Sequence, residues 1–255
     1  MAGSLVLVGT GLRMVGQVTQ EAVEAIRSAD KLFHIVQDVV SDRWLAELNS
    51  TAESLYGTYA EGKPRSETYE EMVELVLAPV RRGQKVCVAL YGHPGVFVKP
   101  AHEAVRRARA EGFVAEMLPG ISAEDCMVAD LGFDPGARGC QSFEATDFLM
   151  RERRFDTSST LLLWQIGGIG VQDFRRSTYW NPKGVRILAQ YLAQAYGEAH
   201  EVIVYEAAVY PIAPPMVHRC PLSLLPNAPV TIASTLYVPP LPDRPVDWEK
   251  LAALT

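Results

Sequence analysis

Three tyrosines and one arginine lie within fourteen residues of one another. Tyr56 and Tyr59 precede Arg65, and Tyr69 follows it by four residues. A phenol has a pKa of about 10 and is a weak base at neutral pH, but a neighbouring guanidinium favours the phenolate and lowers that pKa. Such a group could remove a proton or donate hydrogen bonds to a developing negative charge. Tyr69 also fits the apolar face of a helix, with Arg65 as a solvated charge, and on the pattern alone this structural alternative is the simpler interpretation.

Glycine-bearing loops follow three of the expected strands, at residues 9–11, 92–95 and 167–168. In parallel α/β sheets, ligands sit beyond the carboxyl ends of the strands, where glycine lets the backbone approach a ligand closely. Tight turn geometry explains each loop, taken alone, equally well. The first loop has Met14 where a dinucleotide-binding fingerprint needs glycine, and the chain has no P-loop sequence. Neither kind of nucleotide site is therefore indicated.

The second loop carries the most information about a ligand. Its sequence, YGHPGVF at residues 91–97, combines two glycines and a proline with aromatic rings at the end of an apolar run. Aromatic rings can sandwich a flat base or shield a cation. S-adenosylmethionine offers both, as an adenine and a sulfonium. His93 has no potential metal-ligand partner at close spacing and is interpreted as a local hydrogen-bonding residue.

Short apolar runs alternate with helical patterns along the chain, which predicts a mostly parallel sheet with helical crossovers. The Ser122 and Asp125 pair predicts a helix start. Strands are expected at residues 5–8, 31–35, 85–90, 115–118, 140–144, 160–165, 201–205 and 231–238. Helices are expected at residues 19–28, 66–82 and 185–196, and two further helices are expected, one that begins at Ser41 and one that ends at about Glu111. The segment from Pro239 is expected to be an extended tail.

Composition and charge exclude several classes of protein. The net charge of −6 argues against a nucleic-acid partner, which needs a basic surface. No stretch approaches the roughly 18 apolar residues of a membrane span, and the N-terminus lacks the basic region of a signal peptide, so we expect no membrane contact and a cytoplasmic location. The four cysteines are widely spaced without a C-x-x-C pair, which indicates neither a metal site nor a redox motif.

Three motifs resemble, in order, those of the tetrapyrrole methylase superfamily: VGTG at residues 8–11, YGHPG at residues 91–95 and LPGISAED at residues 118–125. The resemblance implies an α/β fold with two α/β subdomains, expected at residues 1–113 and 114–255, and a cleft between them that binds S-adenosylmethionine. Within the superfamily the chain is most similar to borosin-type enzymes, which N-methylate the backbone amides of peptides. The further matching sequences are KPRSETY at 63–69, DP at 134–135, SFEA at 142–145, LWQ at 163–165 and ST at 234–235.

The resemblance assigns roles residue by residue. Tyr56, Tyr59, Arg65 and Tyr69 match the family's catalytic cluster, and no metal is implied. Tyr59 and Tyr69 with Arg65 would handle proton removal and oxyanion stabilisation, and Tyr56 would help to place the peptide; the identity of the base stays open. The positions matching cofactor-binding residues are Tyr91, His93, Val96, Phe97, Ser122, Ala123, Gln165, Tyr205, Ala207, Ser234 and Thr235.

The fungal relatives fuse the methyltransferase to a clasp region and to the peptide that it modifies. Here residues 239–255 are short and rich in proline, which has no amide proton to replace. The resemblance therefore implies a split form that acts on a separate precursor peptide, as a homodimer or as a heterotetramer with two peptides, and yields S-adenosylhomocysteine.

Two other functions remain open on the sequence. The first is a methylase of a tetrapyrrole precursor, which would share the fold and the cofactor but does not require the tyrosine–arginine cluster. The second is an inactive homologue that binds a peptide or the cofactor without turnover.

Overall fold

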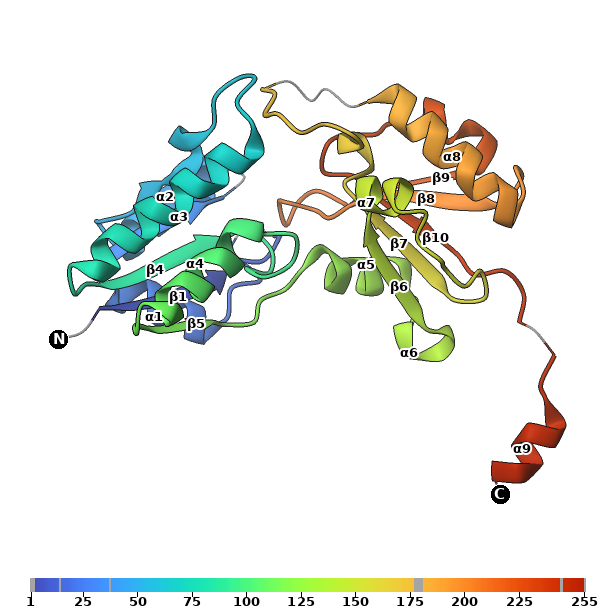
Figure 1. Ribbon diagram of the computed structural model, residues 1–255, viewed down its shortest axis with the longest axis horizontal. Helices are drawn as coiled ribbons and strands as arrows, with labels where there is room; N and C mark the ends of the chain where they lie inside the picture. The colour runs from blue at the N-terminus through green and yellow to red at the C-terminus, as the bar shows by residue number, and fades with distance from the viewer. Residues whose placement is uncertain (1–2, 14, 37, 177–180, 244, 255) are drawn as a thin grey trace. The chain divides into compact units, whose positions relative to one another are not determined.

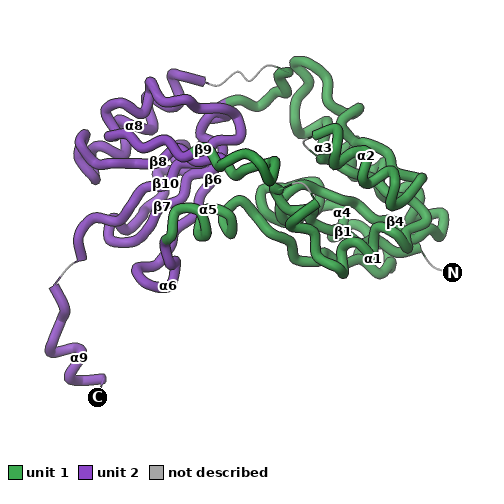
Figure 2. Tube along the Cα trace, turned by 180° about the vertical axis from the view of Figure 1, so that it is seen from behind, with its two compact units in different colours: residues 1–132, 171–177, 207–216 green, residues 133–170, 178–206, 217–255 purple. Residues whose placement is uncertain are grey.

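The computed structural model describes residues 3–13, 15–36, 38–176, 181–243 and 245–254 (Figure 1). Met14 and the ends of the expected subdomains, Met1 and Thr255, lie outside this part of the chain. The chain divides into two compact units (Figure 2). Unit 1 comprises Met1–Gly132, Val171–Ser177 and Ala207–Met216, and unit 2 comprises Phe133–Gly170, Thr178–Glu206 and Val217–Thr255.

Unit 1 is built on a five-stranded sheet whose neighbouring strands run parallel, as the alternation of apolar runs and helices predicts. Its strand order is β3 (Glu53–Ser54), β2 (Lys31–Ile35), β4 (Lys85–Leu90), β1 (Ser4–Gly9) and β5 (Val114–Met117). The connecting helices are α1 (Gln20–Ser28), α2 (Val39–Leu48), the short 3-10 helix η1 (Leu55–Thr58), α3 (Arg65–Arg81) and α4 (Lys99–Ala110).

Strands β1, β2 and β4 of unit 1 are largely buried on both faces. Leu5 and Leu7 of β1 pack in a core that includes the apolar faces of α3 and α4. Val8 packs on the opposite face with Ala22 and Ile26 of α1, because successive side chains of a strand point to opposite sides. This two-sided core fixes the carboxyl ends of β1 and β4 at one edge, where the first two glycine loops emerge.

Unit 1 extends further along the chain than the division expected at residue 113. β5 begins at Val114 and pairs with β1, with Ser4 opposite Val114 and Leu7 opposite Met117. Helix α5 (Ala123–Leu131) follows before the unit ends at Gly132. The turn before Val114 therefore links α4 to the next strand of the same sheet.

Capping residues confirm the helix starts expected at Thr19 and Ser122 and correct those expected at Ser41 and at residue 185, where Asn181 caps α8 (Pro182–Tyr196). Thr19 caps α1 by accepting a hydrogen bond from the backbone N of Ala22 (3.1 Å). Asp38, not Ser41, caps α2, because its carboxylate accepts hydrogen bonds from the backbone N atoms of Val40 and Ser41, each at 2.9 Å. The prediction from Ser41 was wrong because that residue lies in the first turn, where its hydroxyl donates to the Asp38 carboxylate (2.6 Å).

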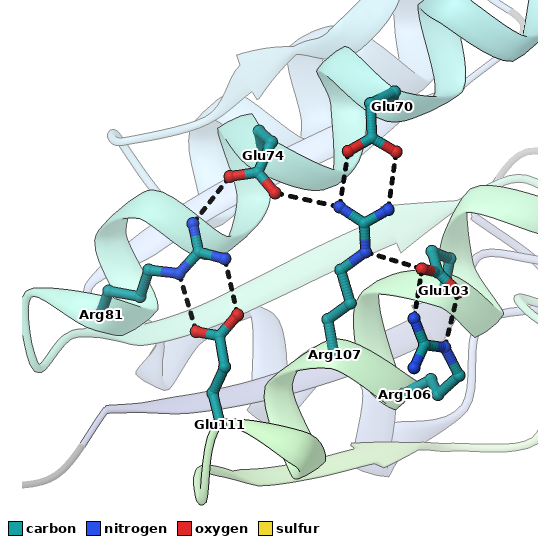
Figure 3. A network of polar contacts seen from close by, with 7 residues as sticks. All are labelled: Glu70, Glu74, Arg81, Glu103, Arg106, Arg107 and Glu111. Carbon is teal, nitrogen blue, oxygen red and sulfur yellow. Dashed lines mark hydrogen bonds and ion pairs between the residues drawn. The ribbon is translucent and has the colours of Figure 1, made fainter.

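Helices α3 and α4 are joined along their exposed faces by a network of ion pairs (Figure 3). Arg107 of α4 donates to the carboxylate of Glu70 through both terminal nitrogens and to Glu74 (3.1 Å), both on α3. Arg81, near the end of α3, donates to Glu74 (2.7 Å) and bidentately to Glu111. Bidentate geometry makes such pairs more specific than single contacts. The network links α4 to the helix whose N-terminal part carries Arg65 and Tyr69.

Unit 2 contains a five-stranded mixed sheet, so the expectation of a mostly parallel sheet is wrong for this part of the chain. β6 and β7 pair in parallel, but β10 pairs antiparallel with both β7 and β8. Parallel neighbouring strands need a long crossover connection, which is usually an α-helix. The link from β8 to β10, which lies wholly within the described residues, contains strand β9 and the 3-10 helix η3 but no α-helix of this kind, and β8 and β10 are antiparallel. The strand order is β6 (Cys140–Glu144), β7 (Thr160–Trp164), β10 (Thr235–Val238), β8 (Glu201–Glu206) and β9 (Met216–Pro221).

The helices of unit 2 include one that the sequence did not predict. Residues 239–243 lack regular structure, as expected of a proline-rich tail, but α9 (Trp248–Leu254) follows with all of its residues exposed. The other short elements are α6 (Pro135–Arg138), α7 (Ala145–Met150), η2 (Ile166–Gly168) and η3 (Leu222–Asn227), with α8 (Pro182–Tyr196) as the long helix. None of the helices in the described residues is long and apolar enough to cross a membrane.

Candidate active site

Three loops of unit 1 meet where β1, β4 and β5 end, and their glycines are needed for that contact. A Cβ on Gly9 would lie 2.3 Å from the carbonyl oxygen of Gly92 and 3.2 Å from the Cα of Gly120. Gly11 and Gly92 exchange backbone hydrogen bonds of 2.8 and 3.3 Å. Gly92 also has a φ of +69°, which favours glycine. Close backbone packing thus accounts for these glycines without a ligand.

The tyrosine–arginine cluster is assembled by η1 and the start of α3. Tyr56 lies in η1, which Ser54 caps, and Tyr59 directly follows it. The rings of Tyr56 and Tyr59 are 5.9 Å apart between centroids. Arg65 is the first residue of α3, and Tyr69 lies about one turn later on the same helix.

Tyr69 packs against the core and also lies near two other phenols. Its side chain is half-buried and packs against the core beneath α3, as the structural alternative requires. Its charge state nevertheless acts on the pKa values of Tyr59 and Tyr91, so its phenol lies close to theirs. Arg65 is also half-buried, not fully solvated.

Lys63 braces the loop between η1 and α3. Its Nζ donates to the backbone carbonyl of Thr58 (2.9 Å) and pairs with the carboxylate of Glu71 on α3. One side chain therefore ties the end of η1 to the helix that carries Arg65 and Tyr69.

Burial dominates the electrostatics of the cluster. Removal from water raises the pKa of Tyr56 to about 12, with Tyr91 adding to the shift, although Tyr56 keeps 43% of its surface exposed. Burial likewise raises the pKa of Tyr59, to which Tyr69, Tyr91 and Tyr56 add, and the guanidinium of Arg65 only partly opposes this rise. The sequence correctly predicts the sign of the arginine's effect. It does not predict that desolvation outweighs it.

Tyr91 belongs to the same group of phenols as well as to the loop after β4. Desolvation of its phenol raises the pKa of Tyr91 although 41% of the residue's surface is exposed, Tyr69 adds to the rise, and Arg65 opposes it. The sequence placed Tyr91 among the cofactor residues alone. The structure brings Tyr91 within electrostatic reach of the cluster. Tyr91 follows β4, which lies beside β2 in the sheet, and β3 on the other side of β2 leads directly into η1.

The remaining residues of this loop differ in exposure and conformation. The ring of His93 accepts a hydrogen bond at Nδ1 from the backbone N of Gly95 (2.9 Å), which is the local role expected of it. Val96 is half-buried, whereas Phe97 is 44% exposed and has a φ of +57°. Among the described residues only four non-glycine residues have positive φ, and Phe97 and Gln165 are two of them. Strained backbone of this kind concentrates at functional sites.

Ser122 and Ala123 lie at the start of α5, beside a pocket of unit 1. Ser122 is buried and forms a capping box with Asp125, whose carboxylate accepts the serine hydroxyl (2.6 Å). The neighbouring pocket has a volume of about 310 Å³. Its lining is Arg13, Gln17, Gly120, Ile121, Asp125, Cys126, Ala129, Asp130 and Ala208, so neither Ser122 nor Ala123 faces it.

Four predicted cofactor residues gather at one end of the sheet of unit 2. Thr235 of β10 lies opposite Tyr205 of β8, and the backbone carbonyl of Ser234 accepts a hydrogen bond from Ile166, directly after Gln165. Ser234, Thr235 and Tyr205 are buried, and Gln165 is half-buried with a φ of +57°. Ala207 follows β8 but clusters with unit 1.

Sequence reasoning missed Phe174. Its ring lies 4.7 Å from that of Tyr59, measured between centroids, although the two residues are more than a hundred positions apart. An aromatic residue inside the charged sequence QDFRR at 172–176 is the one local signal that could have drawn attention to it.

Comparison with known proteins places the chain in a family. Residues 4–213 match the family model described as Tetrapyrrole (Corrin/Porphyrin) Methylases. The chain belongs to the tetrapyrrole methylase family. This confirms the family recognised in the sequence, and the two-sheet α/β architecture agrees with its fold.

Two relatives share more than 40% of their residues with this chain over the aligned regions. A methyltransferase and cyclic peptide (gymnopeptides) precursor from Gymnopus fusipes is 44% identical over 243 residues, which are 94% of this chain. A methyltransferase and type III borosin cyclic peptide precursor from Anomoporia bombycina is 42% identical over 256 residues, covering 99% of this chain. The chain spans 58% and 30%, respectively, of the lengths of these relatives. The likeness of this tetrapyrrole methylase to borosin proteins is therefore confirmed.

Solved structures support the fold. A uroporphyrin-III C-methyltransferase from Thermus thermophilus aligns with a TM-score of 0.65 at 18% identity, covering 94% of this chain and 93% of the other. Identity this low establishes the shared fold and nothing about the substrate. Among the described residues of this methylase, no group of three or more histidine, cysteine, aspartate or glutamate side chains is placed to hold a metal ion.

Proposed function

We propose that the protein is an S-adenosylmethionine-dependent enzyme that N-methylates backbone amides, one after another, in a separate ribosomal precursor peptide. S-adenosylhomocysteine is the product of each transfer. We further propose that it works in the cytoplasm as a homodimer or as a heterotetramer with two peptides. The observation that carries the proposal is the group of four tyrosines around Arg65, in a family member with relatives named as methyltransferases and peptide precursors.

The amide substrate dictates what such a group must do. A peptide nitrogen is a poor nucleophile because its lone pair is delocalised into the carbonyl. Removing its proton gives an imidate whose negative charge lies largely on oxygen. The site must therefore supply a base for the N–H proton and hydrogen-bond donors for that oxygen.

The cluster offers both functions. Phenols with raised pKa values, such as those of Tyr56 and Tyr59, are protonated at neutral pH and are suitable donors to an oxyanion. Arg65 adds a fixed positive charge that favours the phenolate of Tyr59. We assign proton removal and oxyanion stabilisation to Tyr59, Tyr69 and Arg65 together, and placement of the peptide to the more exposed Tyr56.

Several residues fit the cofactor. S-adenosylmethionine supplies an activated methyl group on a positively charged sulfur when it is bound. Tyr91 and Phe97 expose 41% and 44% of their surfaces, which gives unit 1 aromatic faces for an adenine or a cation. The positive φ values of Phe97 and Gln165 mark places where the backbone is held in an uncommon conformation. We propose His93, Val96, Ser122, Ala123, Tyr205, Ala207, Ser234 and Thr235 as the remaining contacts.

The proposal is tested by mixing the purified protein with cofactor carrying a trideuterated methyl group and a synthetic copy of the precursor peptide. Tandem mass spectrometry then locates the label. Trideuteromethyl groups on backbone nitrogens of the peptide support the proposal. Label on the protein itself would indicate self-modification, and label on a tetrapyrrole precursor but not on peptide would overturn the peptide substrate.

A further inference from the structure

Residues 171–176, here called the bracing segment, cross from unit 2 into unit 1 and run beside the loop that leads into α3. The chain leaves unit 2 at Gly170 and returns to it at Thr178. The backbone of the segment forms a short ladder with residues 62–65. Its hydrogen bonds run from Gly62 N to Phe174 O (2.9 Å), from Phe174 N to Lys63 O (3.0 Å) and from Arg65 N to Gln172 O (3.1 Å).

The ladder holds the backbone of Arg65. The first N–H groups of an α-helix have no partner within the helix. Pro64, the residue before α3, provides no side-chain cap, and the N–H of Arg65 instead donates to the bracing segment. Asp173 forms an isolated bridge with Pro64, and Arg65 contributes to lowering the pKa of the Asp173 carboxyl, after the larger effects of hydrogen bonds from the Asp173 backbone and Arg175.

Phe174 extends this support to Tyr59. The two rings are tilted by 36° with centroids 4.7 Å apart, within the range of favourable aromatic pairs. Phe174 is itself half-buried, and the hydrogen bonds on both sides of it fix its backbone. Ring contact at this distance limits the rotamers open to Tyr59 and shields part of its ring from water.

We infer that the bracing segment orients the catalytic cluster and that Phe174 is a positioning residue, which acts on the reaction through the ring of Tyr59. This inference rests on the proposed function for its effect on turnover. A displacement of about 1 Å in a catalytic group can cost on the order of 100-fold in rate. Substrate contact by Phe174 is not required.

The inference predicts two separable changes when the ring is removed. The Tyr59 phenol would lose alignment, which lowers kcat, and would gain water, which lowers its pKa. The groups that act on the Tyr59 phenol are Tyr56, Tyr69, Tyr91 and Arg65, and Phe174→Leu leaves all four in place. A purely structural role would change stability without moving the titration of one tyrosine.

The experiment compares Phe174→Leu with Phe133→Leu in the full-length protein. Phe133 is a matched control because its ring lies 4.9 Å from that of Tyr237 in unit 2. We expect Phe174→Leu to lower kcat with the separate peptide by about 10-fold or more, with the KM for S-adenosylmethionine changed by less than about twofold. Phe133→Leu should keep kcat within about twofold of wild type. Phe174→Tyr, which keeps an aromatic ring at position 174, should have a kcat close to that of wild type. Thermal melts establish that each variant is folded, and Phe174→Met replaces the leucine variant if that one is not.

A second readout does not depend on activity. NMR of protein labelled with ¹³C at the tyrosine Cζ follows each phenol through a pH titration, and Tyr59→Phe identifies the Tyr59 signal. A lower titration midpoint for Tyr59 in Phe174→Leu, with no change in Phe133→Leu, supports the inference. An unchanged midpoint together with wild-type kcat overturns it while the proposed function stands. If the wild-type protein methylates no peptide, the proposed function fails and the NMR midpoint alone decides the role of Phe174.

Discussion

The pH dependence of methylation is the prediction that the structure specifies most closely. Burial raises the pKa of Tyr56 to about 12, and it raises the pKa of Tyr59 as well. The phenol of Tyr59, whose pKa lies above its ordinary value of about 10, is ionised in fewer than about 1 molecule in 100 at pH 8, because each unit of pH below the pKa costs a factor of about 10. If phenolate removes the amide proton, the rate should rise about tenfold per pH unit from about pH 7 to about pH 9.5.

The assay is single-turnover methylation with cofactor and peptide bound before the reaction starts, since multiple turnovers can report product release instead of chemistry. Circular dichroism at each pH shows whether the protein is still folded. Tyr59→Phe should reduce the rate and change the slope if Tyr59 is the base. A rate that is flat across this range in folded wild-type protein would refute the idea that a phenol with a raised pKa accepts the proton.

Three further predictions follow from individual contacts. Arg65→Ala and Tyr69→Phe should each lower the single-turnover rate by about 100- to 1,000-fold while calorimetry shows unchanged cofactor binding; near-wild-type rates would leave the cluster a structural role only. Gly9→Ala should lower the free energy of unfolding by about 3 kcal/mol, because the new Cβ would lie 2.3 Å from a backbone oxygen. Urea melts test this with Gly57→Ala as the control, since a Cβ on Gly57 would meet nothing within 4 Å. Equal effects of the two substitutions would contradict the packing argument. Burial lowers the pKa of His34, although the charge of its partner Asp42 opposes this, so His34 binds a proton more readily in the unfolded protein than in the folded one. The free energy of unfolding should therefore be fully developed above about pH 6.5 and fall as the pH drops below it. In urea melts at about pH 5 to 7, His34→Leu should weaken this pH dependence, and an unchanged dependence would contradict the argument.

The sequence predicts the elements of unit 1 well because its signals are local. The apolar run at residues 31–35 coincides with β2, and that at residues 85–90 with β4. Buried parallel strands are continuous apolar runs, so composition alone identifies them. The same reasoning is weaker in unit 2. Strand β9 has no continuous apolar run, because His218 and Arg219 interrupt it, and it ends in Pro221. The antiparallel pairing of β10 depends on contacts distant in sequence.

The candidate site shows the same division between local and long-range information. The spacing of Tyr56, Tyr59, Arg65 and Tyr69 is visible in the sequence, and the structure brings these residues together. Two features need the fold. Phe174 reaches Tyr59 only through a ladder between distant segments, and the balance between burial and the arginine's charge depends on how much water the core excludes.

The most direct test of the account is the fate of a trideuterated methyl group in a reaction containing the purified protein, labelled S-adenosylmethionine and a separate precursor peptide. If the protein N-methylates peptides, tandem mass spectrometry finds the label on several backbone nitrogens of the peptide. Arg65→Ala then lowers the rate of labelling by about 100- to 1,000-fold while still binding the cofactor. Unlabelled peptide after full incubation, with cofactor binding intact, would contradict peptide N-methylation as the function.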